Sequence, residues 1–333
     1  MKKLLKALLP RKIKIYILRF LAVYKETTSK VFDLYHHLKF SFKEQNLKDD
    51  QAQIKYYLTK HYHIVEKGLA LPEPRPGFGQ PKIIDIIEKA QRYENQFGSD
   101  ELTASIRKTL NEYIAFNSAQ NFELPVQFKN LLSDFIKQGD IGKSGGLKDK
   151  TKNTSSTLTL DEYKSFATGR TSARNFSDEA VSTDLLYKVV DIAKSAPSVC
   201  NRQGWKVHCY SEKDTINHLL SYQNGNTGFT HTINKLLIVT ADVKAFTNYE
   251  SNQAFIDGGL FSMNLLLAIH AAGLGACCLN TCYPSSKEKE VKTAAAIPDN
   301  ERLIMMIAVG SLKDKYSVAY SPRNHTDEIY VPH

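Results

Sequence analysis

Residues 254–279 read AFIDGGLFSMNLLLAIHAAGLGACCL, a mostly apolar run broken near its end by two glycines. Residues 254–272 predict one long helix. Gly273-Leu274-Gly275 predicts where that helix stops, because glycine readily adopts the left-handed conformation found at helix ends. The apolar residues 276–279 then predict a short strand. The stretch therefore predicts a long helix that leads directly into a strand.

Helices and strands are predicted on both sides of this stretch. Residues 161–169 and 182–195 favour helices, the second one starting at a Ser-Thr-Asp sequence typical of helix starts. Residues 206–210, 236–240 and 303–309 favour strands, and the run LLIVT at 236–240 is continuously apolar, as buried strands are. The order predicts a fold of the α+β or α/β class.

The first half of the chain has a different texture. Residues 1–60 and 82–137 repeat apolar side chains at spacings of three and four, which predicts helices. Residues 68–81 contain four prolines and three glycines, which predicts an extended, semi-rigid loop. Residues 139–157 are polar and glycine-rich. We therefore predict a helical region at 1–138, a linker at 139–157 and a second domain at 158–333.

The net charge of +9 resides in the first half of the chain. Residues 1–150 hold 26 Lys and Arg against 17 Asp and Glu, whereas residues 151–333 hold 18 of each. A basic end indicates contact with an acidic surface or partner, or else a solvated helical face. No basic run is interleaved with stacking aromatics, so nucleic acid is not an expected partner.

The N-terminus does not predict a membrane span. Lys14 and Arg19 interrupt the apolar stretch 13–24, so no uncharged run reaches the ~18 residues that a span needs. An amphipathic helix on a membrane surface and a helix docked on its own protein both stay open. The five cysteines all follow residue 199, and their odd number favours a reducing setting. We expect a cytoplasmic protein with peripheral contact to the inner face of the membrane.

Three further segments carry groups suited to binding an anion or a polar ring. Residues 170–176, RTSARNF, place two arginines four apart with two hydroxyls between them, and arginine grips phosphates through paired donors. Residues 196–205, APSVCNRQGW, offer hydroxyl, amide and backbone donors in one turn. Residues 321–323, Ser-Pro-Arg, follow the last predicted strand. Taken singly, such segments are also ordinary arginine-rich turns or helix-to-strand connectors.

Together with residues 257–275, and in this order and spacing, these segments resemble the nitroreductase family from near Tyr163 to near Val331. The resemblance implies an α+β fold, a three-layer sandwich in which helices flank a mixed, mainly antiparallel sheet. It also implies a homodimer that binds FMN at the dimer interface.

The resemblance further assigns cofactor-binding residues and no catalytic side chain. Those expected to face the phosphate and ribityl chain are Arg170, Ser172 and Arg323. Those expected to approach from the other subunit are Pro197, Ser198 and Asn201. Those expected beside the flavin ring are Asn226, Leu279 and Asn280. Arg174 is expected near the pyrimidine edge, where a fixed cation stabilises the charge of a reduced flavin. Within the same segments, Thr171 and Gln203 are included as cofactor-binding residues.

Some features depart from the family. Gly204 stands where the family usually has proline, and Ser321 stands where it often has lysine, so one phosphate or ring contact is in doubt. Residues 1–150 have no counterpart in minimal members. Similar helical extensions occur among nitroreductase-like proteins of bacterial polysaccharide gene clusters. This loose resemblance implies a link to polysaccharide biosynthesis.

The resemblance implies ping-pong hydride transfer, in which NADH or NADPH reduces FMN and a small electron-poor or unsaturated substrate is then reduced. Two alternatives stay open. In one, the flavin site is degenerate, and the basic N-terminal helices tether a non-catalytic protein to a membrane surface or an assembly. In the other, the N-terminal half is a lid that closes Arg75 and Phe78 over the flavin.

Other candidate sites are weaker. Cys277, Cys278 and Cys282 fit no common zinc spacing, and the first two would point to opposite faces of a strand, so no metal is expected. Lone histidines are more often structural, which applies to His61, His63 and His231. No glycine-rich dinucleotide motif follows a strand, so a Rossmann domain is not expected.

Overall fold

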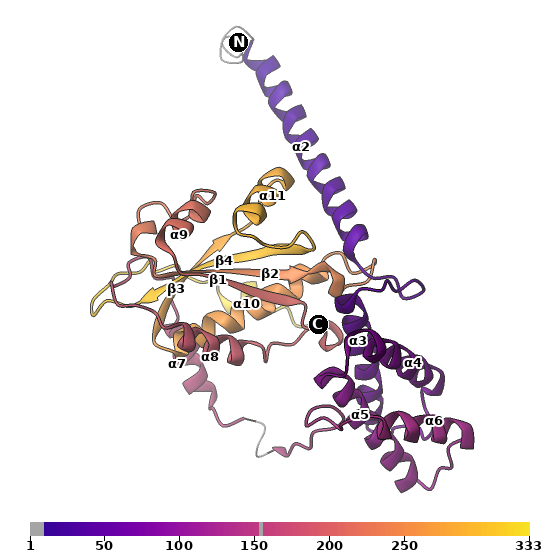
Figure 1. The fold of residues 1–333 in the computed structure, drawn as a ribbon. Coiled ribbons are helices and arrows are strands. Elements are labelled where there is room, and N and C mark those ends of the chain that lie inside the picture. The colour runs from indigo at the N-terminus through magenta and orange to yellow at the C-terminus, as the bar shows by residue number, and fades with distance from the viewer. Residues whose placement is uncertain (1–9, 153–155) are drawn as a thin grey trace.

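The computed structural model describes residues 10–152 and 156–333, in which a helical region precedes a part built around a sheet (Figure 1). The predicted α+β class with a helical N-terminal region is therefore confirmed. The start of the predicted helices at 1–9 and the linker residues 153–155 lie outside the described residues.

Four strands form a sheet in the order β1-β2-β4-β3. They are β1 (Trp205–Tyr210), β2 (Lys235–Asp242), β3 (Leu274–Asn280) and β4 (Glu301–Ser311). All three pairings are antiparallel. The parallel component expected of a mixed sheet is reduced to a bridge between Ser172 and Ala276 at the β3 edge.

Helices cover both faces of this sheet. α8 (Thr183–Ala193) and α10 (Gln253–Ala271) pack on one face, and α9 (Lys213–Leu220) and α11 (Ser285–Ala294) pack on the other. Successive strand residues face opposite sides, so Leu237 and Val239 pack toward α10, while Leu236 and Ile238 pack toward α9. The three-layer sandwich follows, and so does the continuous apolar run of β2, whose two faces are both covered.

The long apolar helix predicted from the sequence is α10. Among the described residues it is long and apolar enough to cross a membrane by length and composition, and half of it is buried inside the structure. Its buried residues, including Phe261, Leu265 and Ile269, pack against the sheet and α8.

Five helices make up the described N-terminal region. They are α2 (Arg11–Phe40), α3 (Gln51–Leu69), α4 (Gln80–Phe97), α5 (Glu101–Ala119) and α6 (Val126–Lys137). α3 to α6 share a core that includes Leu58, Ile83 and Leu132. α2 instead projects away from the other helices (Figure 1).

The proline-rich segment is shorter than predicted and packs within the helical region. α3 continues through Leu69 and α4 already starts at Gln80, because proline is tolerated in the first turn of a helix. Phe78 packs edge-on against Tyr113 at 5.2 Å, and its carbonyl accepts a 2.7 Å hydrogen bond from the Tyr113 hydroxyl. Phe78 is therefore part of the helical core.

The predicted linker is held to α5 along its first half. The amide of Gly142 donates to the carbonyl of Ala104 at 2.9 Å, and the amide of Gly146 donates to Thr109 Oγ1 at 2.9 Å. The chain then reaches α7 (Leu160–Gly169), which Thr159 caps. The domain boundaries themselves stay a prediction.

The helical region contacts the sheet part through α3, the segment before it and the C-terminal end of α2. Phe42 donates its amide to the carbonyl of Phe246 at 3.0 Å, and Tyr56 packs with Phe246 in a shared apolar cluster. Lys244 forms a 2.6 Å ion pair with Asp50. These contacts surround the loop that follows β2.

Candidate functional site

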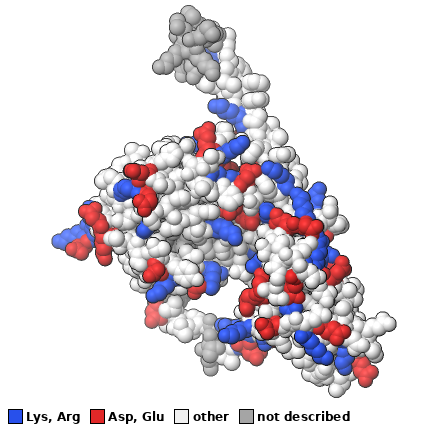
Figure 2. Space-filling model, in the orientation of Figure 1, with Lys and Arg blue, Asp and Glu red and all other residues white. Residues whose placement is uncertain are grey.

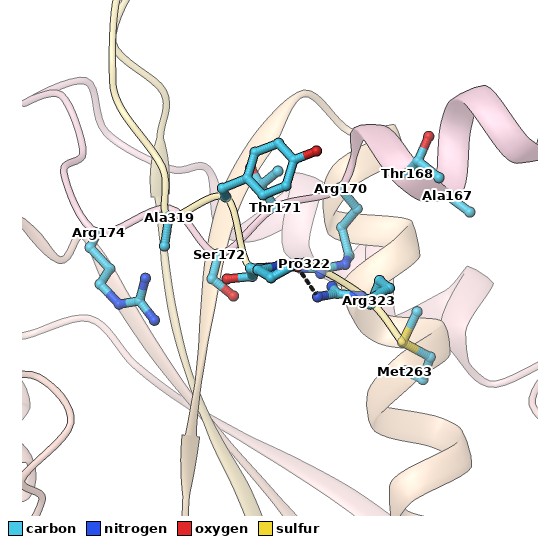
Figure 3. A pocket seen from close by; sticks show the side chains of 12 residues that line it. Ala167, Thr168, Arg170, Thr171, Ser172, Arg174, Met263, Ala319, Pro322 and Arg323 are labelled. Atoms are coloured by element: carbon cyan, nitrogen blue, oxygen red, sulfur yellow. Dashed lines mark hydrogen bonds between the residues drawn. The ribbon is translucent and has the colours of Figure 1, made fainter. Parts of the chain in front are cut away.

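A cavity of about 570 Å³ lies where residues 167–174, α10 and the segment 319–323 meet (Figure 3). Its volume is within the range of small-molecule sites. Five of the residues predicted to bind a cofactor line it, namely Arg170, Thr171, Ser172, Arg174 and Arg323. The structure therefore brings the first and last arginine-bearing segments together, although they lie far apart in the sequence.

The first of these segments owes its shape to the edge of the sheet. Residues 170–174 run beside β3, where the Ala173 amide donates to the carbonyl of Ala276 at 3.0 Å. Alternate residues of an extended chain point to opposite sides. Ala173 is therefore buried in the core, while Ser172 and Arg174 face the cavity, together with Arg170 and Thr171 at the start of the segment.

Phe176 anchors the end of this segment. Its side chain is buried, and its Cβ lies so close to Gly310 that a Cβ added to the glycine would be 2.6 Å away. Glycine at 310 permits this close approach. The anchor places the three preceding polar residues at the mouth of the cavity.

The cavity is strongly positive. Among the described residues, none of Arg170, Arg174 and Arg323 forms an ion pair, and Arg323 donates to the carbonyl of Ser321 at 2.6 Å. Figure 3 shows the side chains of Arg170 and Arg323 converging, with Arg174 on the other side of Ser172. Converging like charges repel one another unless an anion lies between them. The arrangement therefore suits an anionic ligand at the Arg170 end.

The cysteines near this cavity are thiols. Burial raises the pKa of Cys277, although Arg174 and Arg170 oppose the rise, and burial also raises the pKa of Cys278. Cys277 packs on the α9 side of the sheet and Cys278 on the α10 side, as the strand periodicity predicts. In residues 10–152 and 156–333, no group of three His, Cys, Asp or Glu side chains is placed to hold a metal ion.

A second group of predicted residues lies in the turn between α8 and β1. Pro197, Ser198, Asn201 and Gln203 are together there, and none of the four lines the cavity. Cys200, Asn201 and Gln203 have φ angles of 48°, 55° and 52°, which is the left-handed region. Such strained backbone concentrates at functional sites.

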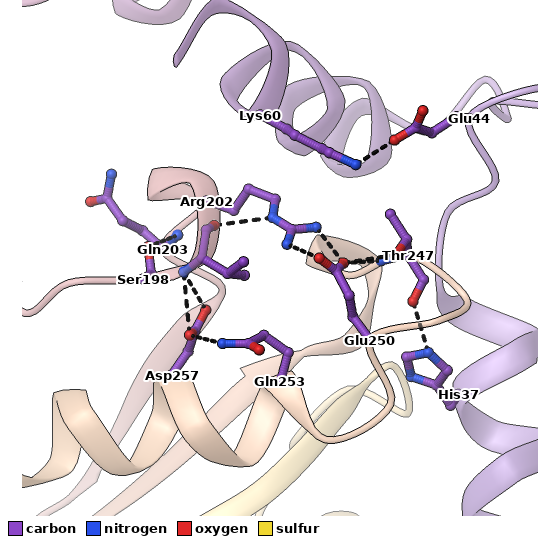
Figure 4. Close-up of polar contacts among 11 residues, drawn as sticks. His37, Glu44, Lys60, Ser198, Arg202, Gln203, Thr247, Glu250, Gln253 and Asp257 are labelled. Carbon is purple, nitrogen blue, oxygen red and sulfur yellow. Dashed lines mark hydrogen bonds and ion pairs between the residues drawn. The ribbon is translucent and has the colours of Figure 1, made fainter. Parts of the chain in front are cut away.

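Two carboxylates hold this turn, Glu250 beside the end of the Arg202 side chain and Asp257 below the turn (Figure 4). The side chain of Arg202 is fully buried and donates to both Glu250 oxygens at 2.7 and 2.8 Å. The amide of Val199 donates to the carboxylate of Asp257, which lies on α10, at 3.2 and 3.3 Å. The strained turn is thus tied to α10 and to the loop after β2.

The C-terminal half of the chain, which contains the cavity and the strained turn, matches a known protein family. Residues 167–311 match the model of the nitroreductase family. The C-terminal half of the chain carries a nitroreductase-family domain. Nitroreductases are oxidoreductases, so the match indicates the reaction class and leaves the substrate open.

Individual relatives of the nitroreductase domain are distant. A protein of Archaeoglobus fulgidus, provisionally named NADH dehydrogenase/NAD(P)H nitroreductase, is 24% identical over 151 residues, which are 44% of this chain and 83% of the relative. A nitroreductase-like protein of Streptococcus mutans is 20% identical, with 52% and 98% of the two chains covered and a TM-score of 0.47. An FMN-dependent nitroreductase of Clostridium difficile is 18% identical, with 47% and 92% covered and a TM-score of 0.41.

The structure explains one of the two departures from the family pattern in this nitroreductase domain. A Cβ at Gly204 would lie 2.7 Å from Cβ of Ala245, so the loop that contacts the helical region leaves no room for a larger residue. Ser321 has a φ of 50° and supplies the carbonyl that holds Arg323. Ser321 lines the cavity, and no contact explains serine there in place of lysine.

The remaining predicted residues lie outside the cavity, Leu279 and Asn280 at the end of β3 and Asn226 in the loop after α9. Leu279 is buried in the core, and Asn280 accepts the amide of Cys282 at 3.3 Å. The buried amide of Asn226 donates to the Leu220 carbonyl at 3.2 Å, so it supports its own loop. The lid residues Arg75 and Phe78 do not line the cavity.

Residue-type patterns did not indicate that Arg202, Glu250 and Asp257 hold the turn between α8 and β1. The motif at 196–205 contained Arg202, but its partner is 48 residues away in the sequence. Burial of an arginine beside a carboxylate is a tertiary feature, so no local signal could have paired them.

Proposed function

We propose that the nitroreductase domain is an FMN-dependent NAD(P)H oxidoreductase that reduces a small electron-poor or unsaturated substrate. The observation that carries the proposal is the cavity whose lining, among the described residues, holds three arginines, five hydroxyl-bearing side chains and no carboxylate. A phosphate dianion matches this donor set, because guanidinium groups bind phosphate through paired hydrogen bonds.

Each of the five predicted residues that line the cavity has a role in this proposal. Arg170 and Arg323 would hold the phosphate, with Thr171 and Ser172 as hydroxyl donors. Arg174, set apart from that pair (Figure 3), would place a fixed positive charge near the flavin ring. FMN would supply the two-electron chemistry. The protein would bind and orient the reactants, with no side chain required as an acid or base.

A homodimer is part of the proposal. α10 exposes an apolar row that includes Ile256, Leu260 and Met263, with exposed fractions of 53%, 46% and 46%. Met263 also lines the cavity, so a second copy packed on this row would cover the cavity. Such a copy would also bring its own strained turn at 198–203 toward the cofactor.

The second candidate is a non-catalytic protein tethered by its N-terminal helices. Gly204 and Ser321 are the features in its favour, and packing against Ala245 accounts for Gly204. The projecting helix α2 supports a tether, but a tether is compatible with catalysis. A cytoplasmic location and a link to polysaccharide biosynthesis stay predictions.

The test is the visible spectrum of the purified chain, with FMN affinity measured for two variants. We expect flavin bands that bleach with NADH or NADPH. Arg170→Ala should weaken FMN binding by about tenfold or more, because a charge-assisted contact is lost. Arg75→Ala, the matched control, removes an arginine outside the cavity and should leave FMN affinity unchanged. A colourless protein that takes up no FMN would contradict the proposal and favour the non-catalytic tether.

A further inference from the structure

Helix α2 exposes a continuous apolar face to solvent. Along its length, apolar residues recur at spacings of three, four and seven, which places them on one side of a helix. The exposed members that define this face are Ile13, Ile17, Phe20, Tyr24, Val31 and Leu38. Their exposed fractions lie between 42% and 70%. Uncharged side chains cover most of the projecting helix in Figure 2.

α2 docks on the nitroreductase domain with its opposite face, which is polar over residues 25–37. Asp33 pairs with Arg302 at 2.9 Å, and Nε2 of the buried His37 lies 2.9 Å from the carbonyl oxygen of Thr247. His36, buried beside it, bonds the carbonyl of Asp299. An amphipathic helix normally packs its apolar face on its own protein and turns its polar face to water. In α2 the two faces are reversed, so the apolar face is left for a partner outside this copy of the chain.

The charges beside the apolar face indicate what that partner is. Lys12, Arg19 and Lys30 run along one border of the face, and Lys14 and Lys25 run along the other. Among the described residues, none of these five forms an ion pair. The sequence of residues 1–25 contains eight Lys and Arg and no Asp or Glu. A second copy of such a helix would be repelled, whereas an anionic lipid surface would be attracted.

We propose that α2 lies in the plane of a membrane surface that contains anionic phospholipid, with its apolar face in the acyl boundary. The bordering lysines and arginine would reach the phosphate groups, as basic side chains of interfacial helices do. Tyr16 and Tyr24 suit the same depth, where amphipathic rings are enriched. Because the domain is attached to the polar face, it would sit on the water side of the helix. The proposal does not depend on the flavin assignment.

The experiment is flotation of the full chain with vesicles of phosphatidylcholine, with or without phosphatidylglycerol. Ile17→Glu/Phe20→Glu alters the apolar face, and Ile15→Glu/Leu18→Glu is the matched control on the opposite side of the helix. Ile15 and Ile17 are equally exposed at 41% and 42%, and both double variants lower the net charge by two. All four side chains are exposed, so neither variant should unfold the domain.

We expect the chain to float with phosphatidylglycerol vesicles and not with phosphatidylcholine alone, and binding to weaken at high salt. The apolar-face variant should bind the vesicles about tenfold or more weakly than the wild type. The loss of affinity in the control variant should be several-fold smaller. Absence of binding to either vesicle, or equal loss in both variants, would overturn the proposal. The proposal would also be overturned if the wild type bound no vesicles and only the apolar-face variant had a lower mass in solution. That result would assign the face to a second copy.

Discussion

Replacing Glu250 by glutamine should destabilise the nitroreductase domain, because Arg202 would stay fully buried without a charged partner. Burial alone would raise the pKa of Glu250, but hydrogen bonds from Arg202 and Thr247 outweigh it and lower that pKa from 4.5 to about 2. A difference of this size corresponds to about 3 kcal/mol at neutral pH. Since a quarter of the Glu250 side chain meets solvent (24%), we expect a loss of about 2 kcal/mol.

The chain offers a local probe for this measurement. Trp205 is its one tryptophan, and it stacks on Phe261 at 5.0 Å in the domain core. Its fluorescence during urea unfolding would report the free energy of unfolding of the wild type and of Glu250→Gln. The matched control is Asp191→Asn, which breaks an exposed ion pair with Lys194 and should leave the free energy of unfolding nearly unchanged.

The stability difference between the wild type and Glu250→Gln should also change with pH in a defined direction. The pKa of Glu250 is depressed in the folded state, so its stabilising effect is complete above about pH 5 and is lost as the pH falls toward 2. The difference between wild type and Glu250→Gln should therefore shrink by about half at pH 3. A loss below about 0.5 kcal/mol at pH 7, or a difference that is equal at pH 7 and pH 3, would refute the reasoning.

Three further outcomes are expected. Gly204→Ala should lower stability by about 1–3 kcal/mol, because its Cβ would meet Ala245, and an unchanged melting temperature would contradict this. Arg107→Ala should lower the free energy of unfolding of the helical region by about 3–5 kcal/mol, since it breaks the buried ion pair with Glu94. Far-UV circular dichroism during urea unfolding measures this loss, and a loss below about 1 kcal/mol would contradict the prediction. Burial lowers the pKa of His36 from 6.5 to about 4, so the attachment of α2 should weaken as the pH falls from 6.5 toward 4. Hydrogen exchange over residues 31–40, corrected for its intrinsic pH dependence, should be faster at pH 5 than at pH 7.5, and equal protection would exclude this effect.

The elements that sequence patterns predicted are those whose signals are local. The apolar run of α10 and its glycine stop, the capped start of α8 and the uninterrupted β2 all depend on residues within one turn or one strand. α9 and α11 were not predicted. They are short, and α11 buries few of its residues, so neither carries an apolar pattern long enough to stand out.

The candidate site was predictable as a set of residue types but not as an arrangement. Arg170 and Arg174 follow from a local motif, yet their convergence with Arg323 depends on the C-terminal segment returning beside α10. The separation of the 198–203 turn from the cavity also depends on where α10 carries Asp257. Such distances between remote segments have no counterpart in local spacing.

By itself, the sequence of this protein determined the α+β order of the nitroreductase domain, the helices of the N-terminal region and the arginines of the cavity. Only the tertiary structure decided which surface each pattern faces. The apolar periodicity of α2 predicts an amphipathic helix, and it is equally consistent with a helix docked on its own protein. Docking through Asp33, His36 and His37 leaves the apolar face outside, because contacts between remote segments, and not local periodicity, determine which face of a helix is covered.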